Sequence, residues 1–529
     1  MYLTTTNFAD FTDYGDSQIL TLTYGRRCFR STNQKKIDFP LVSCSLIRIF
    51  AARMAETLKE KTAKGLFWGA LNNGATQVLN LVFGIFLGRL LSTDDYGIIA
   101  LITIFTLLAG CIQAAGFSQA LANLKTPTKR DYNAVAWFNI LAGCSIYVLL
   151  FFCAPLIASF FDKPLLTDVS RLAFLSIPIS AIGIVPNAKL WIELRNREQA
   201  IASIIALLTS GCCGVWMAWN GWGYWSLAWQ QIIYIIVATI FKYYFTRWIP
   251  TLPVDFSPIK QMFAFSSKML ITNMLTVISQ NVLTFIFGKM LPISTVGLFS
   301  QANKWNTMGS SLVSNTISQV AQPVLASINE EDFRQERVFR KMLRFTSFIS
   351  FPLMFGLALV AHEFILLTVG PTWERCVPLL QILCIGGAFL PLHTLFQNYI
   401  ISRGRSDLYL RLVALQIFLQ IGITLGLASY GITIMVTAFT LLNISYTLCW
   451  HFAQKSIHCF STVEALKDTV PFLIIAACCM VVTYYATLWT EVLWIRFCMR
   501  ILIASAVYFC VMKLFHVKSL EECLAFIRR

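Results

Sequence analysis

Long apolar stretches alternate with short polar connections from about residue 66 to the end of this chain. A helix that crosses a bilayer needs roughly 20 predominantly apolar residues, and these stretches reach that length. The pattern therefore predicts an all-α integral membrane protein with about fourteen transmembrane helices. The predicted helices cover residues 66–91, 97–123, 134–160, 169–192, 198–219, 222–246, 262–288, 296–325, 342–362, 376–402, 409–428, 431–453, 468–488 and 493–515.

One stretch of sequence recurs about 200 residues further along the chain. Residues 88–98 run from Gly-Arg-Leu-Leu to Gly-Ile, and residues 288–298 run from Gly-Lys-Met-Leu to Gly-Leu. Upstream, Asn73 matches Asn273. The two copies join the first predicted helix to the second and the seventh to the eighth, so both copies point the same way. We expect two six-helix lobes related by a pseudo-twofold axis along the membrane normal, with a substrate between them.

The repeat and the polar connections divide the chain into four parts. Residues 54–255 form the predicted N-lobe, and residues 256–460 form the predicted C-lobe after a proline-containing linker. Residues 461–529 supply two further helices and a cytoplasmic tail. Residues 1–53 are polar and aperiodic, without the basic and apolar segments of a secretory signal. This N-terminal extension is either untranslated, with synthesis starting at Met54, or a disordered cytoplasmic tail.

Composition and charge support a membrane location and an orientation. The chain is 57% hydrophobic and only 13% charged, whereas soluble domains carry about 25% charged residues. The net charge is +16, and the basic residues gather in the connections of one face, as in the run from Arg334 to Arg344. By the positive-inside rule this face is cytoplasmic, and so are both termini. The basic balance thus reflects orientation, and we expect no nucleic-acid partner.

The sixteen cysteines contain no CxxC pair and no metal-ligand cluster. Most of them lie within apolar segments, which is typical of small buried residues. We therefore expect neither a metal nor a cofactor.

Several predicted helices carry polar residues that are expensive in a bilayer unless they face a wet cavity or another helix. In the first helix they are spaced four and then three residues apart, which places them on one face. One interpretation is a hydrated central cleft, and the other is hydrogen bonding between helices. For His393 alone, a packed and hydrogen-bonded side chain is the stronger alternative. The candidate binding residues are Asn73, Gln77, Asn80, Asn273, Gln280, Gln301, Lys304, Asn315, His393 and Gln397.

Lys304 is the most informative single charge, because it lies well inside its predicted helix. A lysine at that depth favours a water-filled cavity and an anionic ligand. The first six predicted helices contain no Asp or Glu away from their ends, and Glu363 is the nearest equivalent in the second lobe. The cavity is therefore expected to prefer an anion.

Three motifs carry a resemblance to a known family, and the similarity spans about residues 64–515. They are the segment from Gly88 to Gly97, the segment from Gly297 to Lys304, and Ser402-Arg403-Gly404-Arg405-Ser406-Asp407. Together they resemble the polysaccharide transporters of the multidrug/oligosaccharidyl-lipid/polysaccharide flippase superfamily, closest to Wzx-like exporters. The resemblance implies a bacterial inner-membrane flippase for capsule, O-antigen or exopolysaccharide synthesis. Its substrate would be an undecaprenyl-diphosphate-linked oligosaccharide, moved to the periplasmic leaflet by alternating access, with a polysaccharide polymerase and glycosyltransferases as partners.

Three alternatives stay open from the sequence. A multidrug or cation exporter of the same superfamily is expected to need a buried carboxylate, which the first lobe lacks. A lipid II flippase shares the architecture and would differ in its cellular role. A membrane polysaccharide polymerase is disfavoured because the predicted external loops are short, so we expect a transporter and not an enzyme.

The late start gives a first testable prediction. If synthesis begins at Met54, the intact mass of the protein purified from its natural source corresponds to residues 54–529. A measured mass that includes residue 1 would contradict the late start.

Overall fold

The computed structural model describes residues 68–69, 71–114, 116–124, 127–252, 255–328, 332–457, 461–515, 517 and 520–521, all within the compact unit Gly65–Arg529. The predicted N-terminal extension, residues 1–53, and the predicted start at Met54 lie outside these residues. Nearly all the described residues are helical, and none of them is in a strand. The prediction of an all-helical chain is therefore confirmed for this part.

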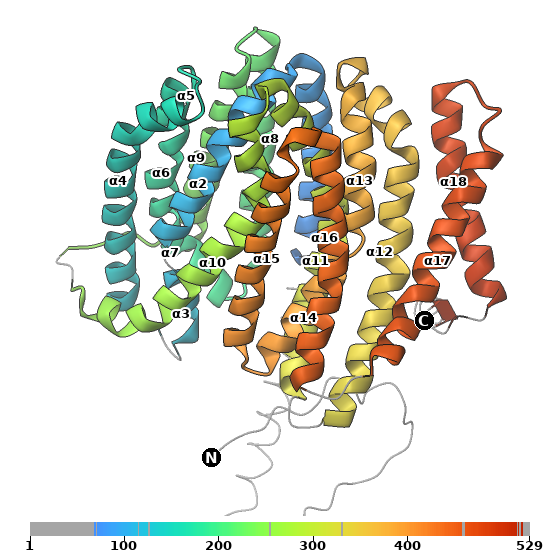
Figure 1. Cartoon of the computed structure of the whole chain (residues 1–529). Coiled ribbons are helices and arrows are strands. Elements are labelled where there is room, and N and C mark those ends of the chain that lie inside the picture. The colour runs from blue at the N-terminus through green and yellow to red at the C-terminus, as the bar shows by residue number, and fades with distance from the viewer. Residues whose placement is uncertain are drawn as a thin grey trace, which may run out of the picture. The chain divides into compact units, whose positions relative to one another are not determined.

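The first described helix covers residues 71–90 and is followed by the labelled helices of Figure 1. In the first half of the chain these are α2 (Thr93–Ala114), α3 (Phe117–Asn123), α4 (Lys129–Phe160), α5 (Leu166–Phe174), α6 (Ser176–Ile182), α7 (Ile184–Ile192), α8 (Asn196–Trp219) and α9 (Tyr224–Thr246). In the second half they are α10 (Ser257–Met290), α11 (Ile293–Ser327), α12 (Asp332–Thr368), η1 (Pro371–Cys376), α13 (Val377–Gly387), α14 (Leu390–Ser402), α15 (Ser406–Gly426), η2 (Ala428–Tyr430), α16 (Ile432–Ile457), α17 (Thr462–Ala486) and α18 (Leu493–Leu514).

Within the described residues, each predicted membrane segment coincides with one helix or with one broken helix. The segment 97–123 is broken between α2 and α3, 169–192 is divided into α5, α6 and α7, and 376–402 is divided into α13 and α14. Within the described residues, 11 helices are long and apolar enough to cross a membrane, or up to 12 if the bent run from α5 to α7 is one span. The first helix and α11 are not among them, because both carry many polar residues. The number fourteen stays a prediction.

The two copies of the repeat meet backbone to backbone. Helices α2 and α11 pack along each other, and Gly97 of α2 lies directly against Gly297 of α11. The contact is reciprocal: a Cβ atom on Gly97 would overlap the carbonyl oxygen of Ile293, and one on Gly297 would overlap that of Thr93. Ile293 and Thr93 occupy the same position of the two copies. The repeat therefore forms a contact with twofold character, as helices with small residues commonly do in membranes.

The last turn of the first helix and that of α10 each reach across to a helix end in the other half of the chain. Arg89 donates hydrogen bonds to the carbonyls of Leu367 and Thr368 at the end of α12, each at 2.5 Å. Lys289, at the equivalent position, donates to the carbonyl of Phe160 at the end of α4, at 2.6 Å. Cations are favoured at helix C-termini, where carbonyls lack intrahelical partners. The repeated cation thus caps a helix in each half.

The second of these caps extends into a loop. Lys289 also binds the carboxylate of Asp162, in the connection between α4 and α5, at 2.8 Å. This hydrogen bond and the charge of Lys289 hold the pKa of Asp162 below its usual range.

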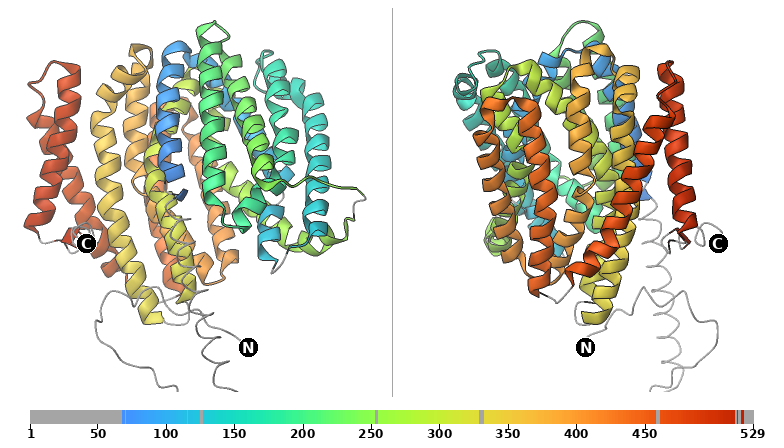
Figure 2. Two further views of the ribbon diagram at one scale, coloured as in Figure 1. Left: turned by 180° about the vertical axis from the view of Figure 1, so that it is seen from behind. Right: turned by 45° about the vertical axis from the view of Figure 1, so that its right-hand side comes forward.

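Helices α17 and α18 form a hairpin that stands beside α12 at one edge of this unit, as Figures 1 and 2 show. Following the orientation that the charge pattern predicts, we call the end where α12 begins the inner end and the end where α18 begins the outer end. At the inner end Arg340 of α12 binds Asp468 of α17 at 2.7 Å and Glu464 at 2.9 Å. At the outer end Glu363 of α12 binds Arg500 of α18 at 2.7 Å. Ion pairs thus hold the hairpin against α12 at both ends.

The glycine contact gives a second prediction. Replacing Gly97 or Gly297 with Ala places a methyl group where the facing backbone lies, so we expect each variant to lose about 1–3 kcal/mol of folding free energy and to unfold at a lower temperature. Tryptophan fluorescence during thermal unfolding of the purified protein measures this.

Gly110, in the same helix α2, provides a matched control because a Cβ atom there has no described atom within 4 Å. Gly110→Ala should unfold at the wild-type temperature or slightly higher, since Ala favours helix over Gly. Equal losses in Gly110→Ala and Gly97→Ala would contradict the close contact between the repeats.

Candidate functional site

Two of the predicted binding residues on α11 lie directly against the first helix. Lys304 is 11 residues beyond Ile293, where α11 begins, which places it about 16 Å along the helix. A Cβ atom built on Gly84 would lie 3.0 Å from Lys304 Nζ, and one on Gly88 would lie 3.5 Å from Gln301 Nε2. The two glycines therefore leave room for a charged and an amide side chain between the helices.

Aromatic rings surround the ammonium group of Lys304. Its Nζ atom lies 5.9 Å from the centre of the Tyr96 ring and 5.6 Å from that of the Trp305 ring. Both distances are within the range of cation–π attraction. Tyr96 is held edge-on by Trp373, with ring centres 5.2 Å apart, and Trp373 Nε1 donates to the carbonyl of Gly88 at 2.8 Å. The ring of Tyr96 is thereby fixed beside the first helix.

Several polar atoms of Tyr96 and of the turns of α11 that carry Lys304 are buried without a hydrogen-bond partner among the described residues. They are the Gln301 amide oxygen and nitrogen, Trp305 Nε1, Asn306 Oδ1 and the Tyr96 hydroxyl. Most buried polar groups in proteins are hydrogen-bonded, and each exception costs about 1–3 kcal/mol. We call Tyr96, Gln301, Lys304, Trp305 and Asn306 the α11 cluster. It offers a cation, N–H donors and oxygen acceptors, which suits a ligand with phosphate and hydroxyl groups.

Comparison of the two repeats shows that most of this chemistry belongs to the second copy. At the positions of α2 that match Gln301, Lys304 and Trp305 in α11, the chain has Leu101, Ile104 and Phe105. Leu101 is buried against Gly288 in the same way that Gln301 is buried against Gly88. The scaffold is thus nearly symmetric, whereas the polar residues are not.

The other predicted residues of the first helix are half-buried. Gln77 donates through Nε2 to the hydroxyl of Ser311 on α11 at 3.3 Å. Asn73 and Asn80 lie on the same helix, and both are half-buried. The structure therefore joins the first helix to α11 at Gln77 as well as at Gly84 and Gly88.

The predicted residues of α10 and the inner half of α11 are more open. Asn273 is half-buried, while Gln280 and Asn315 are exposed. Neighbouring polar residues of α10 turn toward α15: Thr276 contacts the Tyr409 hydroxyl at 3.4 Å, and Ser279 donates to Gln420 at 3.4 Å. These two contacts match the alternative interpretation, hydrogen bonding between helices.

His393 and Gln397 lie on α14, which packs along α11. His393 is buried, and its Nε2 lies 2.9 Å from the hydroxyl of Thr447 on α16. That is the environment expected for a packed, hydrogen-bonded histidine. Gln397 is half-buried.

The structure adds three residues to those expected from the sequence: Tyr96, Trp305 and Asn306. Asn306 Oδ1 faces Gly387, the last residue of α13, which ends there. Tyr96 and Trp305 could have been found by comparing the repeats, because Val296 and Phe105 replace them in the other copy. Asn306 has the smaller polar residue Thr106 as its counterpart, so the repeat gave a weaker signal there.

Acidic residues do not complete a cation or metal site in the described chain. Glu363 is buried, but its carboxylate is bound by Arg500. The described residues contain no group of three or more His, Cys, Asp or Glu side chains that could hold a metal ion. A hydrated cleft between the lobes stays a prediction.

Comparison with known proteins identifies relatives over most of the chain. The family model "Polysaccharide biosynthesis protein" matches residues 86–378. The chain is 26% identical over 376 residues to an uncharacterized membrane protein in the cps region of Klebsiella pneumoniae, covering 67% of this chain and 74% of that protein. It is 23% identical over 405 residues to the lipopolysaccharide biosynthesis protein WzxC of Escherichia coli (strain K12), covering 75% and 82%.

The fold also matches a solved structure. The lipid II flippase MurJ, in an inward closed conformation, superposes with a TM-score of 0.67 at 16% identity, over 84% of this chain and 98% of that chain. This likeness confirms the predicted helical membrane-transporter fold, and the sequence matches confirm the resemblance to polysaccharide transporters. Since the family model covers more than half of its length, the chain belongs to the polysaccharide biosynthesis protein family and is a multi-span membrane protein.

Proposed function

We propose that the protein is a flippase that moves an oligosaccharide, carried on a lipid diphosphate, from the cytoplasmic to the periplasmic leaflet of a bacterial inner membrane. Membership of the polysaccharide biosynthesis family and similarity to WzxC support this function. The observation that carries the proposal is the α11 cluster. It is a group of buried side chains of α11 and Tyr96 whose polar atoms have no hydrogen-bond partner among the described residues, together with Lys304.

The chemistry of such a substrate fits the residues of the cluster. A lipid diphosphate is anionic, and the ammonium of Lys304 is a suitable partner for one of its phosphate oxygens. The amide of Gln301 and the indole N–H of Trp305 supply further donors, and Asn306 Oδ1 accepts a hydrogen bond from a hydroxyl group. Binding would satisfy atoms that are unpaired in the protein alone, which is a source of selectivity for a polar ligand.

The glycan would bind along the polar faces of the neighbouring helices. The amides at Asn73, Gln77, Asn80, Asn273, Gln280, Asn315 and Gln397 are proposed to contact sugar hydroxyls in a cleft between the lobes, with His393 beside them. Alternating access would then move one lobe against the other about this cleft. A polymerase and glycosyltransferases are the expected partners, since a flipped repeat unit must be made before transport and joined afterwards.

A multidrug or cation exporter is the second candidate, and the charges of the described residues count against it. A cation site needs a carboxylate that is not neutralised. Glu363 is bound by Arg500, and the α11 cluster contains a lysine and no acid.

A lipid II flippase is a further alternative, because it has the same fold and also carries an anionic lipid-linked substrate. Loss of cell-wall synthesis on gene deletion would indicate lipid II, and loss of capsule or exopolysaccharide would indicate the proposed function.

The proposal predicts the effect of removing the lysine. Lys304→Ala should lower surface-polysaccharide export about tenfold or more, because the phosphate loses a charge-assisted hydrogen bond worth about 1.5–3 kcal/mol. Export is measured as extracellular polymer in a deletion strain that expresses the variant at the wild-type level.

Lys260→Ala is a matched control, since Lys260 is an exposed lysine in the first turn of α10. It should export normally, and Lys304→Arg should retain part of the activity because the positive charge remains. Normal export by Lys304→Ala at normal abundance would remove Lys304 from the mechanism.

The difference between the two repeats predicts that one substitution at Gln301 raises the stability of the protein and lowers its transport activity. Gln301→Leu introduces the residue that the other repeat carries at this position, Leu101. Because it removes a buried amide without partners, the variant should gain about 1–3 kcal/mol of folding free energy and unfold at a higher temperature. It should nevertheless export less polymer, since the substrate loses an amide partner.

The reverse change at the equivalent position, Leu101→Gln, is the control. It should destabilise the protein, because Leu101 is buried among apolar side chains. If Gln301→Leu is more stable and exports at the wild-type rate, Gln301 does not contact the substrate.

A further inference from the structure

A large pocket lies away from the α11 cluster, between α12, α13, α16 and the α17–α18 hairpin. Its volume is about 1050 Å³. The walls are mainly apolar, with Phe355, Phe389, Leu473 and Met480 among them. Pockets for small ligands usually measure about 300–1,000 Å³. The space is therefore large enough for the polar end of a lipid and part of its chains.

The pocket opens to the surface of the protein on the hairpin side. Three of its lining residues on α17 are exposed: Tyr484 by 44%, Val481 by 54% and Tyr485 by 66%. Apolar and aromatic side chains at this position of a membrane-spanning hairpin face the bilayer. A molecule could therefore enter from the lipid phase with its apolar part still among apolar groups.

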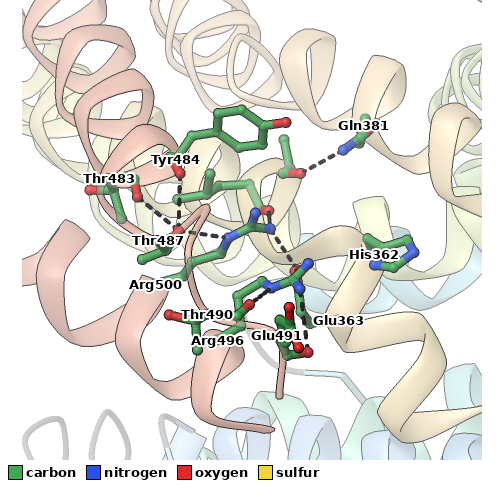
Figure 3. Close-up of polar contacts among 12 residues, drawn as sticks. His362, Glu363, Gln381, Thr483, Tyr484, Thr487, Thr490, Glu491, Arg496 and Arg500 are labelled. Carbon is green, nitrogen blue, oxygen red and sulfur yellow. Dashed lines mark hydrogen bonds and ion pairs between the residues drawn. The ribbon is translucent and has the colours of Figure 1, made fainter. Parts of the chain in front are cut away.

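Two arginines share one carboxylate at the outer end of this pocket, as Figure 3 shows. Arg500 donates through Nη1 to Glu363 at 2.7 Å and through Nε to Thr487 at 3.3 Å. Arg496 donates through Nε to the carbonyl of Thr490 at 2.8 Å, but its Nη1 is 3.7 Å from Glu363, too far for a hydrogen bond. Among the described residues, the two guanidinium groups thus have a single carboxylate between them.

Glu363 neutralises one of the two arginines, and the charge that is left over lies on Arg496, the more exposed of the two. The Arg496 side chain is 26% exposed, whereas those of Arg500 and Glu363 are 6% and 1% exposed. At the rim, His362 and Glu374 form a separate contact at 3.8 Å. Because a net charge is costly near the apolar part of a bilayer, an anion beside Arg496 would be stabilising.

The two arginines and Glu363 lie near the outer end of α12. Glu363 is five residues before Thr368, the end of α12, which corresponds to about 8 Å along the helix. The cations therefore lie near the outer surface, and the apolar walls extend from them toward the membrane centre. This is the order of groups in a phospholipid, with phosphate outside and acyl chains inside.

We propose that this pocket is a binding site for an anionic glycerophospholipid of the outer leaflet, with its phosphate on Arg496 and its acyl chains against α12, α13 and α17. The lipid is a resident partner and not the transported molecule. Glu363 holds Arg500 in place and limits the positive charge at the site. This proposal does not rest on the proposed function, because it concerns binding alone.

Native mass spectrometry of the purified full-length protein tests the site. The protein is titrated with phosphatidylglycerol and phosphatidylcholine of identical acyl chains, and the retained lipid is counted for each. Wild type should retain phosphatidylglycerol preferentially, and Arg496→Gln should bind it about tenfold more weakly, because one charge-assisted contact is lost. Arg496→Lys should keep most of the binding.

Two further variants make the test specific. Arg375→Gln removes a positive charge from an exposed residue near the same end that does not line the pocket, and should bind as wild type does. Glu363→Gln raises the net charge of the cluster and should bind phosphatidylglycerol more tightly. Thermal unfolding of each variant confirms that it is folded.

Three results would overturn the proposal. They are equal retention of the two phospholipids by wild type, equal loss of binding in Arg375→Gln and Arg496→Gln, and displacement of phosphatidylglycerol by an equal concentration of a polyprenyl phosphate. The last result would assign the pocket to an isoprenoid chain.

Discussion

The backbone contact between α2 and α11 is the constraint on which the rest of the structure depends. Gly97 and Gly297 let the two helices approach until each glycine faces a carbonyl of the other helix. Any side chain at these positions would separate the helices and with them the two halves of the repeat. The contact also fixes the register of the preceding segments. In this register Arg89 reaches the end of α12, and Lys289 reaches the end of α4.

This register explains how a symmetric scaffold supports a single polar site. Once the first helix lies along α11, Gly84 and Gly88 face Lys304 and Gln301. In the other copy of the repeat, Gly288 faces Leu101. A buried apolar residue such as Leu101 stabilises the scaffold, whereas a buried amide without partners such as that of Gln301 costs folding free energy. Apolar residues fill the matching positions of α2, so the polar side chains of Gln301 and Lys304 are kept for something other than stability, and ligand binding is the natural use.

The sequence predicted the helices well because their signal is local. Apolar length identifies a membrane segment without knowledge of its neighbours. The breaks between α2 and α3 and within α5–α7 escaped prediction, because they depend on packing against other helices. Gly116 illustrates this: it precedes α3 with a φ of 74°, packed against Ser266 and Met269 of α10. For the same reason the sequence predicted Gln301 and Lys304 but not Tyr96, whose position is set by Trp373 and the first helix.

Four cations of the second half, Lys289, Arg340, Arg500 and Lys304, lie in three kinds of environment, and this comparison sets Lys304 apart. Lys289 binds a backbone carbonyl and a carboxylate at the end of a helix. Arg340 and Arg500 bind carboxylates that hold the hairpin to α12. Each of these cations is explained by the contact that it makes. Lys304 has the faces of Tyr96 and Trp305 around it, and the described residues supply it with no carboxylate. Cation–π contacts offset only part of the cost of placing an ammonium group inside a membrane protein. Because every other cation in this comparison has a structural partner, the one without such a partner is the residue whose partner is best sought in the substrate.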